Sequence, residues 1–508
     1  MHKVLLINWD NYPNIASGGV YAWAKLLVES LSDFEFVVFN CLSNPNVNSV
    51  YILPRNVSRV MEIPLYGNLR FEEFYGANLE DHSLARIISK FKKTNDSAIE
   101  GRFKPIFEHL LGELTSSHAD TRLVADLLFE LNTFFKIHDV RTCMESSAAF
   151  STFAKVLRND RVYSGIKVRE AFDLFSFIQR VLLVASIPLP QVDLIHSSNA
   201  WFPALAGVCL KRRDGTPLLV TEHGVAFKDL LLYHRLYAVS PSYNLLWKTT
   251  MTNVIKTIYD SADLISPVCE ANSGMTKLLD STTKTRVCYN GIDIRKFAPL
   301  NVQTQEGERA TPTVVYVGRI ELLKDVLNLI EAISYVKTQL PNVECRIYGS
   351  STDLEYAKEC VNLVQELQLQ KNVRFMGVTA SPQLAYNSGD VVVLSSVREG
   401  FPYTVIEAMS CGKAVVATNV GGVSEALANC GFLVRSRRPV ELSKAILRAL
   451  IDPDLRTELG ARAMITVEQK FTIEKSVLEY RQIYEEMLSL NSTSYQTVSC
   501  RAIRVKPL

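Results

Sequence analysis

Short apolar runs alternate with stretches of helical periodicity along much of this chain, most regularly after residue 312. The runs are typical of buried strands, and the stretches between them carry apolar residues every three or four positions, as amphipathic helices do. The predicted strands are 313–318, 343–349, 373–377, 390–395, 413–418 and 431–434. The predicted helices are 324–339, 354–369, 381–388, 404–410, 423–428 and 439–451. This order predicts βαβ units and a parallel sheet.

The same alternation appears in the first part of the chain, where a second parallel sheet is expected. Its predicted strands are Lys3–Trp9, Phe34–Cys41, 193–196, 217–221, 264–266 and 286–289. Its predicted helices are Tyr21–Leu31, 200–211, 243–260 and one from Glu270. Residues of about 68–190 interrupt the alternation with helical periodicity at 70–92, 104–116, 120–137, 146–157 and 165–187. We predict a helical insertion, whose role in packing, partner contact or acceptor shaping stays open.

The length of 508 residues exceeds what one hydrophobic core usually supports, so at least two domains are expected. The polar stretch 298–312 predicts a linker, which places an α/β domain at 1–297 and another at 298–472. Amphipathic helices are predicted at 454–470 and 473–489. The polar tail 491–508 is expected to be disordered.

Composition narrows the class of protein. A net charge of +2 gives no overall basic excess, so we expect no nucleic-acid partner. The ten cysteines lack metal-ligand spacing, and several stand in apolar runs, which favours free thiols in a reducing cytoplasm. We expect neither a signal peptide at the first residues nor a membrane-spanning segment. The expected location is the cytoplasm, with association at the inner face of the membrane left open.

The stretch 391–409 carries two candidate carboxylates. It predicts a buried strand, a loop through Glu399 and a helix that opens near Thr404 and contains Glu407. Ligands of parallel α/β sheets bind at the carboxyl ends of the strands, where ionised carboxylates accept hydrogen bonds from sugar hydroxyls. The alternatives are that Thr404 and Glu407 form a capping box and that Glu399 is a solvated loop charge.

Other candidates follow other strands. Arg319 and Lys324 place two cations after the strand 313–318, which suits a diphosphate, although both could be surface charges. Gly18 and Gly19 lie between the first strand and helix, where glycine lets a backbone approach an anion or simply makes a tight turn. His223 follows the strand 217–221, and it serves either hydrogen bonding near neutral pH or structure.

Together these motifs resemble family 4 of the retaining glycosyltransferases. The resemblance rests on Arg319 to Lys324, on Glu399 and Glu407 with seven residues between them, and on Gly421-Gly-Val-Ser-Glu425. Gly18-Gly19, His223-Gly224 and Asn290-Gly-Ile-Asp293 extend it to the first domain. The sequence TEHG after a long helical insertion is most similar to the glycosyltransferases of Pel exopolysaccharide systems.

The resemblance implies a GT-B fold, in which two Rossmann-like domains face each other across a cleft, and a helix 473–490 that crosses back to the first domain. It implies that Arg319 and Lys324 bind the donor diphosphate, that Glu407 binds the ribose and that Glu399 binds the hexose. The implied catalytic residues are His223, Arg319, Lys324 and Glu399. The implied nucleotide-sugar-binding residues are Gly18, Gly19, Arg319, Lys324, Arg374, Phe375, Met376, Glu399, Gly400, Phe401, Pro402, Tyr403 and Glu407.

The expected activity is therefore transfer of a hexose, glucose from UDP-glucose, to a polysaccharide or glycoconjugate acceptor, with no metal and with a membrane export partner left open. Two alternatives remain: a catalytically silent nucleotide-sugar-binding scaffold and a UDP-sugar epimerase. One residue departs from the family pattern, because Asp325 stands where members commonly carry glycine. Its carboxylate could pair with Lys324 and weaken diphosphate binding, or favour the start of a helix.

Overall fold

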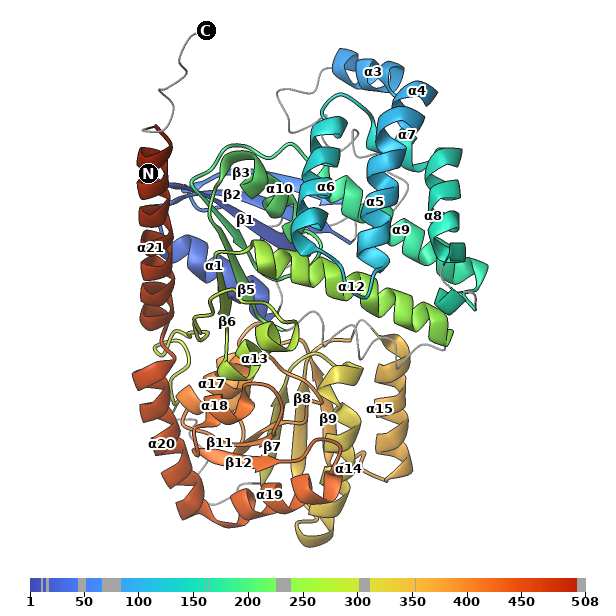
Figure 1. Cartoon of the computed structure of the whole chain (residues 1–508). Coiled ribbons are helices and arrows are strands. Elements are labelled where there is room, and N and C mark those ends of the chain that lie inside the picture. Colours follow the sequence, from blue (N-terminus) through green and yellow to red (C-terminus); the bar gives the residue numbers. More distant parts are fainter. Residues whose placement is uncertain are drawn as a thin grey trace. The chain divides into compact units, whose positions relative to one another are not determined.

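The computed structural model describes the chain except residues 11, 15–17, 44–51, 66–83, 160, 164, 225–238, 301–310, 352 and 500–508. The described residues form two compact units (Figure 1). The first unit contains Met1–Pro267, Ser273–Arg286 and the chain from Tyr480. The second contains Val268–Asn272 and Val287–Glu479. Each unit holds a parallel sheet with helices, which confirms the predicted α/β class.

The sheet of the first unit has six parallel strands in the order β3-β2-β1-β4-β5-β6. The sequence did not predict β3, because charged residues interrupt its apolar pattern and it is only partly buried. The strands are β1 (Lys3–Trp9), β2 (Glu35–Leu42), β3 (Val57–Pro64), β4 (Leu194–Ser197), β5 (Leu218–Glu222) and β6 (Leu264–Pro267).

The predicted strand at 286–289 is wrong. The only pairing nearby in the described chain is an isolated bridge between Ile265 and Thr285. At this point the chain leaves the first unit, whose segment ends at Arg286, and enters the second at Val287. The apolar residues here are buried inside the second unit and not in a sheet. Cys288 is 1% exposed, and its thiol donates to the carbonyl of Ser476 in the same unit.

Four helices accompany this sheet: α1 (Gly19–Ser30), α10 (Ala204–Asp214), α12 (Pro241–Ser261) and α13 (Glu270–Leu278). Gly207 lets α10 approach the sheet closely. A Cβ atom at this position would lie 2.9 Å from the side chain of Ile7 and 3.0 Å from that of Ile195. Those contacts are tighter than side chains normally make, so the close packing of α10 on the central strands requires a glycine at position 207.

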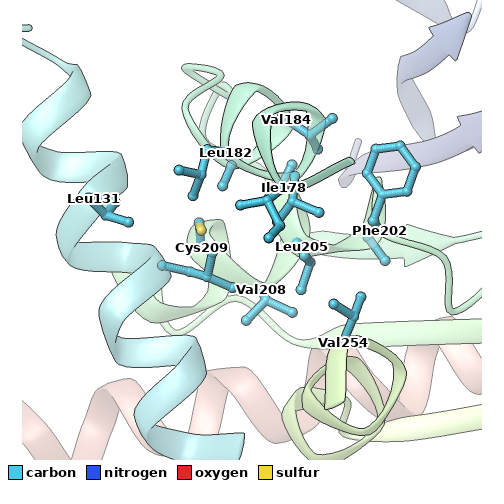
Figure 2. Packing of buried hydrophobic residues seen from close by; sticks show 14 of the residues in the cluster. Leu131, Ile178, Leu182, Val184, Phe202, Leu205, Val208, Cys209 and Val254 are labelled. Atoms are coloured by element: carbon cyan, nitrogen blue, oxygen red, sulfur yellow. The ribbon is translucent and has the colours of Figure 1, made fainter. Parts of the chain in front are cut away.

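The inserted segment is helical throughout its described part, as its periodicity predicted, and the start of the predicted helix at 70–92 lies outside the described residues. Its α6, α9 and neighbours bury apolar side chains against α10 and α12. Figure 2 shows Leu131, Ile178 and Leu205 turned toward one shared core. The elements are α3 (Leu84–Lys93), α4 (Asp96–Ala98), the π-helix η1 (Ile99–Phe103), α5 (Lys104–Thr115), α6 (Thr121–Phe135), α7 (Val140–Met144), α8 (Ser147–Asn159), the 3₁₀-helix η2 (Arg161–Tyr163) and α9 (Val168–Ala185).

The second unit repeats the same architecture. Its strand order is β12-β11-β10-β7-β8-β9, so both sheets follow the Rossmann order, with the switch point between β7 and β10 here. The strands are β7 (Thr313–Val317), β8 (Glu344–Tyr348), β9 (Val373–Gly377), β10 (Val391–Leu394), β11 (Ala414–Thr418) and β12 (Gly431–Val434). The helices are the 3₁₀-helix η3 (Leu322–Lys324), α14 (Val326–Gln339), α15 (Leu354–Glu366), α16 (Pro382–Asn387), α17 (Tyr403–Ser410), α18 (Val423–Leu427), α19 (Pro439–Ile451) and α20 (Pro453–Lys470).

The last helix, α21 (Ile473–Ser499), passes from the second unit into the first at Tyr480. It extends past the predicted end at 489, so the expectation of a disordered tail from Asn491 is wrong as far as Ser499. The segment contains no proline or glycine that would end the helix. Residues 500–508 lie outside the described residues. None of the described helices combines the length and apolarity that a bilayer crossing needs.

Candidate functional site

The switch point of the second sheet brings together the loops that follow β7 and β10. The backbone N–H of Val397 donates to the carbonyl of Leu323 over 2.9 Å. The hydroxyl of Ser395 donates to the carbonyl of Lys324 over 2.9 Å. These bonds hold η3 against the loop that carries Glu399. Two segments far apart in sequence therefore form one site at the carboxyl edge of the sheet.

Lys324 and Glu399 form the centre of this site. The Nζ of Lys324 lies 2.6 Å from Oε1 of Glu399, and the hydroxyl of Ser396 donates to the same oxygen over 2.6 Å. The side chains of Lys324 and Glu399 are only 20% and 9% exposed. The alternative that Glu399 is a solvated loop charge is therefore wrong. Sequence analysis did not single out Ser396, although a hydroxyl three residues before a candidate carboxylate was a usable signal.

Arg319 lies after β7 but is arranged differently. Its guanidinium is 62% exposed and pairs with Glu321, with Nη1 3.0 Å from Oε2. Its backbone is fixed, because the Tyr316 hydroxyl donates to its carbonyl over 2.8 Å. The backbone on either side is crowded: a Cβ atom on Gly349 would lie 1.8 Å from the carbonyl oxygen of Gly318. A rigid strand end thus presents an exposed, long cationic side chain.

Glu407 lies on α17 and faces the interior of the second unit. The Tyr386 hydroxyl donates to its Oε2 over 2.7 Å. Burial raises the pKa of Glu407 to about 7, and the bond from Tyr386 opposes this rise. The alternative of a capping box is wrong, because the N-cap is Pro402 and the Thr404 hydroxyl donates to the carbonyl of Val317 instead. Thr404 and Glu407 therefore form hydrogen bonds with Val317 and Tyr386, and not with the backbone at the start of their own helix.

The loop before α17 is held by neighbours on both sides. The carbonyl of Gly400 accepts from the N–H of Gly422 over 2.7 Å, and the carbonyl of Phe401 accepts from the Asn290 amide over 3.1 Å. Gly421 adopts φ +54°, and a Cβ atom there would lie 2.0 Å from the carbonyl oxygen of Glu399. The glycine pair 421–422 therefore allows this segment to approach the loop at Glu399 and Gly400. This close packing is a physical reason for the Gly421-Gly422 motif, which supported only the family resemblance at the level of sequence.

Pro402 and Tyr403 complete this loop and start α17. Pro402 is buried and Tyr403 is half-buried. The hydroxyl of Tyr403 is buried and forms no hydrogen bond within the described residues, and burial raises its pKa. The phenol is thus a neutral group at the first helical position of α17, next to the candidate carboxylates.

Three of the implied nucleotide-sugar-binding residues, Arg374, Phe375 and Met376, lie on β9, the edge strand of the second sheet. The Nε of Arg374 lies 3.1 Å from Oε1 of Glu344, and the arginine side chain is 65% exposed. Phe375 and Met376 are 37% and 46% exposed. As neighbours on one strand, these two side chains point to opposite faces of the sheet, so each face of the edge strand carries one apolar side chain on which a flat base can stack.

The candidates of the first unit lie at the start of α1 and the end of β5. Gly18 is the N-cap of α1 with φ +95°, and both Gly18 and Gly19 are exposed. His223 packs edge-on against Trp23, with ring centroids 4.5 Å apart. Burial lowers the pKa of His223 to about 3, so the imidazole is neutral. Its Nε2 is buried and has no hydrogen-bond partner in the described part of the chain.

A second histidine supports this group, and sequence analysis did not identify it. His196 on β4 hydrogen bonds through Nδ1 to the Tyr484 hydroxyl (2.7 Å) and through Nε2 to the Thr221 hydroxyl (2.8 Å). It also packs edge-on against Trp23 at 5.3 Å. Burial lowers its pKa to about 3. The aromatic cluster around Trp23 therefore links the position of His223 to α21 within the first unit.

Two six-stranded parallel sheets of Rossmann order, each with its candidate groups at the carboxyl edge, define the GT-B class of glycosyltransferases. The comparisons agree with this class. Sucrose-phosphate synthase from Thermosynechococcus elongatus aligns over 96% of this chain and 100% of its own, with a TM-score of 0.61 and 19% identity. Anabaena Alr3699/HepE in complex with UDP-glucose aligns over 96% and 100%, with a TM-score of 0.59 and 16% identity.

Sequence comparisons give the family. The model "Glycosyl transferases group 1" matches residues 302–465, and "Domain of unknown function (DUF3492)" matches residues 2–280, more than half of the chain. A D-inositol 3-phosphate glycosyltransferase of Gordonia bronchialis is 27% identical over 61% of this chain and 70% of its own length. An N-acetyl-alpha-D-glucosaminyl L-malate synthase of Bacillus anthracis is 22% identical over 67% and 89%. The chain belongs to the DUF3492 family, and its second half matches the model of the group 1 glycosyl transferases.

Proposed function

We propose that this protein is a retaining glycosyltransferase of family 4 that transfers glucose from UDP-glucose to a polysaccharide or glycoconjugate acceptor. The observation that carries the proposal is the half-buried pair of Lys324 and Glu399 at the switch point of the second sheet. Ligands of doubly wound sheets bind at this edge. A lysine held there by a carboxylate is a preorganised cation for a leaving diphosphate.

In the proposed donor site, each of these side chains binds a different part of the nucleotide-sugar. Lys324 and the longer, exposed Arg319 bind the diphosphate, since both carry fixed positive charge at the end of β7. Glu399 orients Lys324 through their 2.6 Å contact and accepts hydrogen bonds from the hexose with its remaining lone pairs. Glu407 accepts the ribose hydroxyls, and Arg374, Phe375 and Met376 bind the base.

The proposed reaction follows a front-face course. The bond between the anomeric carbon and the β-phosphate oxygen breaks, and its electron pair stays on the leaving UDP. The acceptor hydroxyl bonds to the anomeric carbon from the same face, and its proton passes to the departing phosphate oxygen. Lys324 and Arg319 stabilise the charge that develops on the phosphate. No step in this course draws on a metal ion, and metal independence stays a prediction.

The first unit contributes Gly18, Gly19 and His223 to the proposed reaction. The depressed pKa of His223 fits a neutral hydrogen-bonding residue for the donor sugar better than a proton donor at neutral pH. Its buried Nε2 lacks a partner within the described residues, which suits a group reserved for a ligand. The exposed glycine N–H groups at the start of α1 suit an anion.

One structural neighbour supports the choice of donor. The Anabaena protein was solved in complex with UDP-glucose, whereas the two sequence relatives are a D-inositol 3-phosphate glycosyltransferase and an N-acetyl-alpha-D-glucosaminyl L-malate synthase. The similarity to Pel-type enzymes leads us to propose a role in exopolysaccharide synthesis in the cytoplasm, next to a membrane export partner. The silent-scaffold alternative is less well supported, because the site keeps all four of Arg319, Lys324, Glu399 and Glu407.

Calorimetric titration with UDP, ADP and GDP tests the proposal. We expect selective binding of UDP to the full chain and a clear loss of affinity in Arg319→Ala. The rate of UDP release from UDP-glucose should fall by about a hundredfold in Lys324→Ala, the usual effect of losing one charge-stabilising group.

Lys358→Ala, which removes an exposed lysine of α15, is the matched control and should keep normal turnover. Absence of nucleotide binding, or normal turnover in Lys324→Ala, would overturn the proposal.

A further inference from the structure

The inserted helices of the first unit border an open surface pocket that the proposed transfer reaction does not use. It has a volume of about 690 Å³ and lies where the end of α3, the π-helix η1 and the turn after α6 meet. That volume is within the range of small-molecule sites. Its lining residues are Lys92, Lys93, Asn95, Ser97, Ala98, Gly101, Arg102, Ile137 and His138. We call it the α3–η1 pocket.

The charges of the α3–η1 pocket are all positive. Lys92, Lys93 and Arg102 line it, and none of the three forms an ion pair with a carboxylate of the described residues. Three acidic residues are close in sequence but do not line the pocket: Glu100 is paired with Lys104 at 2.6 Å, Asp139 accepts from Thr142 at the start of α7, and Asp96 lies between Asn95 and Ser97. Cations held together without counter-charges repel one another, so a bound anion would relieve a cost that the folded chain bears.

His138 adds a group that lacks a partner. Its ring stacks on Phe134 with centroids 4.1 Å apart, and its Nδ1 is buried without a hydrogen bond among the residues that the structure describes. Burial lowers the pKa of His138, and the positive charges of Arg102, Lys93 and Lys90 lower it further, against a bond to the backbone of Lys93. Burial is the largest cause of this lowered pKa, and two of the cations that add to it, Arg102 and Lys93, line the pocket with His138.

The backbone of the pocket is also unusual. Residues 99–103 form a π-helical turn within an otherwise α-helical stretch from Asp96 to Thr115. Such turns occur frequently at functional sites. Gly101 lies in this turn and lines the pocket, and a Cβ atom on it would meet no atom within 4 Å. The turn therefore places Arg102 at the pocket and leaves open space beside it.

We propose that the α3–η1 pocket binds a phosphate-bearing anion through the cations Lys92, Lys93 and Arg102. Phosphate matches this set because it carries more than one negative charge and accepts hydrogen bonds from a guanidinium and from ammonium groups together. Ala98 and the partly exposed Ile137 give the pocket an apolar side for the rest of the ligand. The phosphate belongs to a soluble nucleotide-like molecule or to a lipid headgroup, and the experiment below separates these sources.

The test compares two equivalent glycine substitutions. Gly101→Glu introduces a negative charge into the pocket, whereas Gly112→Glu introduces one on the exposed surface of α5, outside the pocket. Neither added side chain meets an atom within 4 Å at its Cβ, so both variants should fold. A second pair removes two positive charges from the inserted helices: Lys92→Gln with Lys93→Gln at the pocket, and Lys155→Gln with Arg158→Gln on α8.

Two probes are used with the full chain saturated with UDP, so that the donor site does not contribute. Inorganic pyrophosphate is titrated by calorimetry, and phosphatidylcholine vesicles with about one third phosphatidic acid, whose headgroup is a phosphate monoester, are tested by sedimentation. Pyrophosphate binding indicates a soluble phosphate ligand, and binding to the anionic vesicles alone indicates a lipid headgroup. In either arm, the two pocket variants should bind about tenfold more weakly, as expected when charge-assisted hydrogen bonds are lost.

The control variants should bind each probe as the wild type does, and all four variants should bind UDP normally. The inference is overturned if the wild type binds neither probe, or if Gly112→Glu and the α8 variant lose as much affinity as the pocket variants. The second result would mean that overall charge, not this pocket, attracts the anion. Because UDP binding is measured separately, failure here is distinguishable from failure of the proposed transferase site.

Discussion

Two carboxylates with seven residues between them have different chemical states in this structure. Glu399 accepts hydrogen bonds from Lys324 and Ser396, so a positive charge lies directly beside its carboxylate. Glu407 is buried beside the phenol of Tyr386, and its pKa rises to about 7. Sequence alone treats the two as equivalent acceptors. Only their surroundings separate a carboxylate that pairs with a lysine from one whose pKa is raised by burial.

Glu407→Gln should change the pH dependence of stability. The folded chain keeps a proton on Glu407 up to about pH 7, whereas the unfolded chain releases it near the ordinary value of 4.5. The wild type therefore loses stability relative to Glu407→Gln as pH rises from 4.5 through 7. We expect equal urea midpoints below pH 4.5 and a higher midpoint for the variant at pH 8.

Tyr386→Phe provides a check on the same prediction. It removes the hydrogen bond that opposes the rise in the pKa of Glu407, so the pH window should move upward. A wild type that is more stable than Glu407→Gln at pH 8 would contradict the burial argument, as would a stability difference that is independent of pH.

At the scale of elements, the start of α14 explains the departure from the family's glycine. Asp325 is the N-cap of this helix and has a left-handed φ of 49°. Glycine adopts this conformation without strain, and aspartate is one of the few other residues that tolerate it. Lys324 pairs with Glu399, so the concern that Asp325 would neutralise the lysine is not supported by the observed pairing.

Asp325→Gly should stabilise the second unit by about 1 kcal/mol, the order of the cost of a left-handed residue. Burial raises the pKa of Asp325, and its Oδ2 lacks a hydrogen bond in the described residues, so removing the carboxylate is also favourable at neutral pH. Thermal unfolding measures the gain. Asp325→Ala is the control, since it removes the carboxylate but keeps the strain. An alanine variant as stable as the glycine variant would contradict the explanation from φ.

For the molecule as a whole, the two units are each completed by segments distant in sequence. The first unit needs the end of α21, where Tyr480, Ile483 and Tyr484 are at most 1% exposed. Tyr484 also bonds to His196 over 2.7 Å. The inserted helices share the core of α10 and α12, so they are part of the first unit's stability (Figure 2).

A chain that ends at Glu479 should therefore lose the fold of the first unit. Each lost buried side chain contributes roughly 1.5–3 kcal/mol, and several of them together approach the net stability of a domain, about 5–15 kcal/mol. Hydrogen exchange should show lost protection in β1, β4 and β5, while β7 and β10 stay protected. A chain that ends at Ser489 keeps the buried residues up to Met487 and is the control. Unchanged protection in the shorter chain would refute the prediction.

The sequence by itself determined the α/β class and the order of elements, because short apolar runs and helical periodicity are local properties. It also placed Lys324, Glu399 and Glu407 at strand ends, since the carboxyl edge of a parallel sheet follows from the alternation of strands and helices. Its misses occurred where burial came from elsewhere: the partly exposed β3, the non-strand 286–289 and the absent capping box at Thr404.

Tertiary structure decided which groups meet and in what state. Lys324 and Glu399 are 75 positions apart, and only the pairing of β7 with β10 at the switch point brings them to 2.6 Å. The neutral His223, the high pKa of Glu407 and the cations of the α3–η1 pocket likewise depend on desolvation and on neighbouring charges. These are properties of the folded surroundings, which no local pattern along the chain encodes.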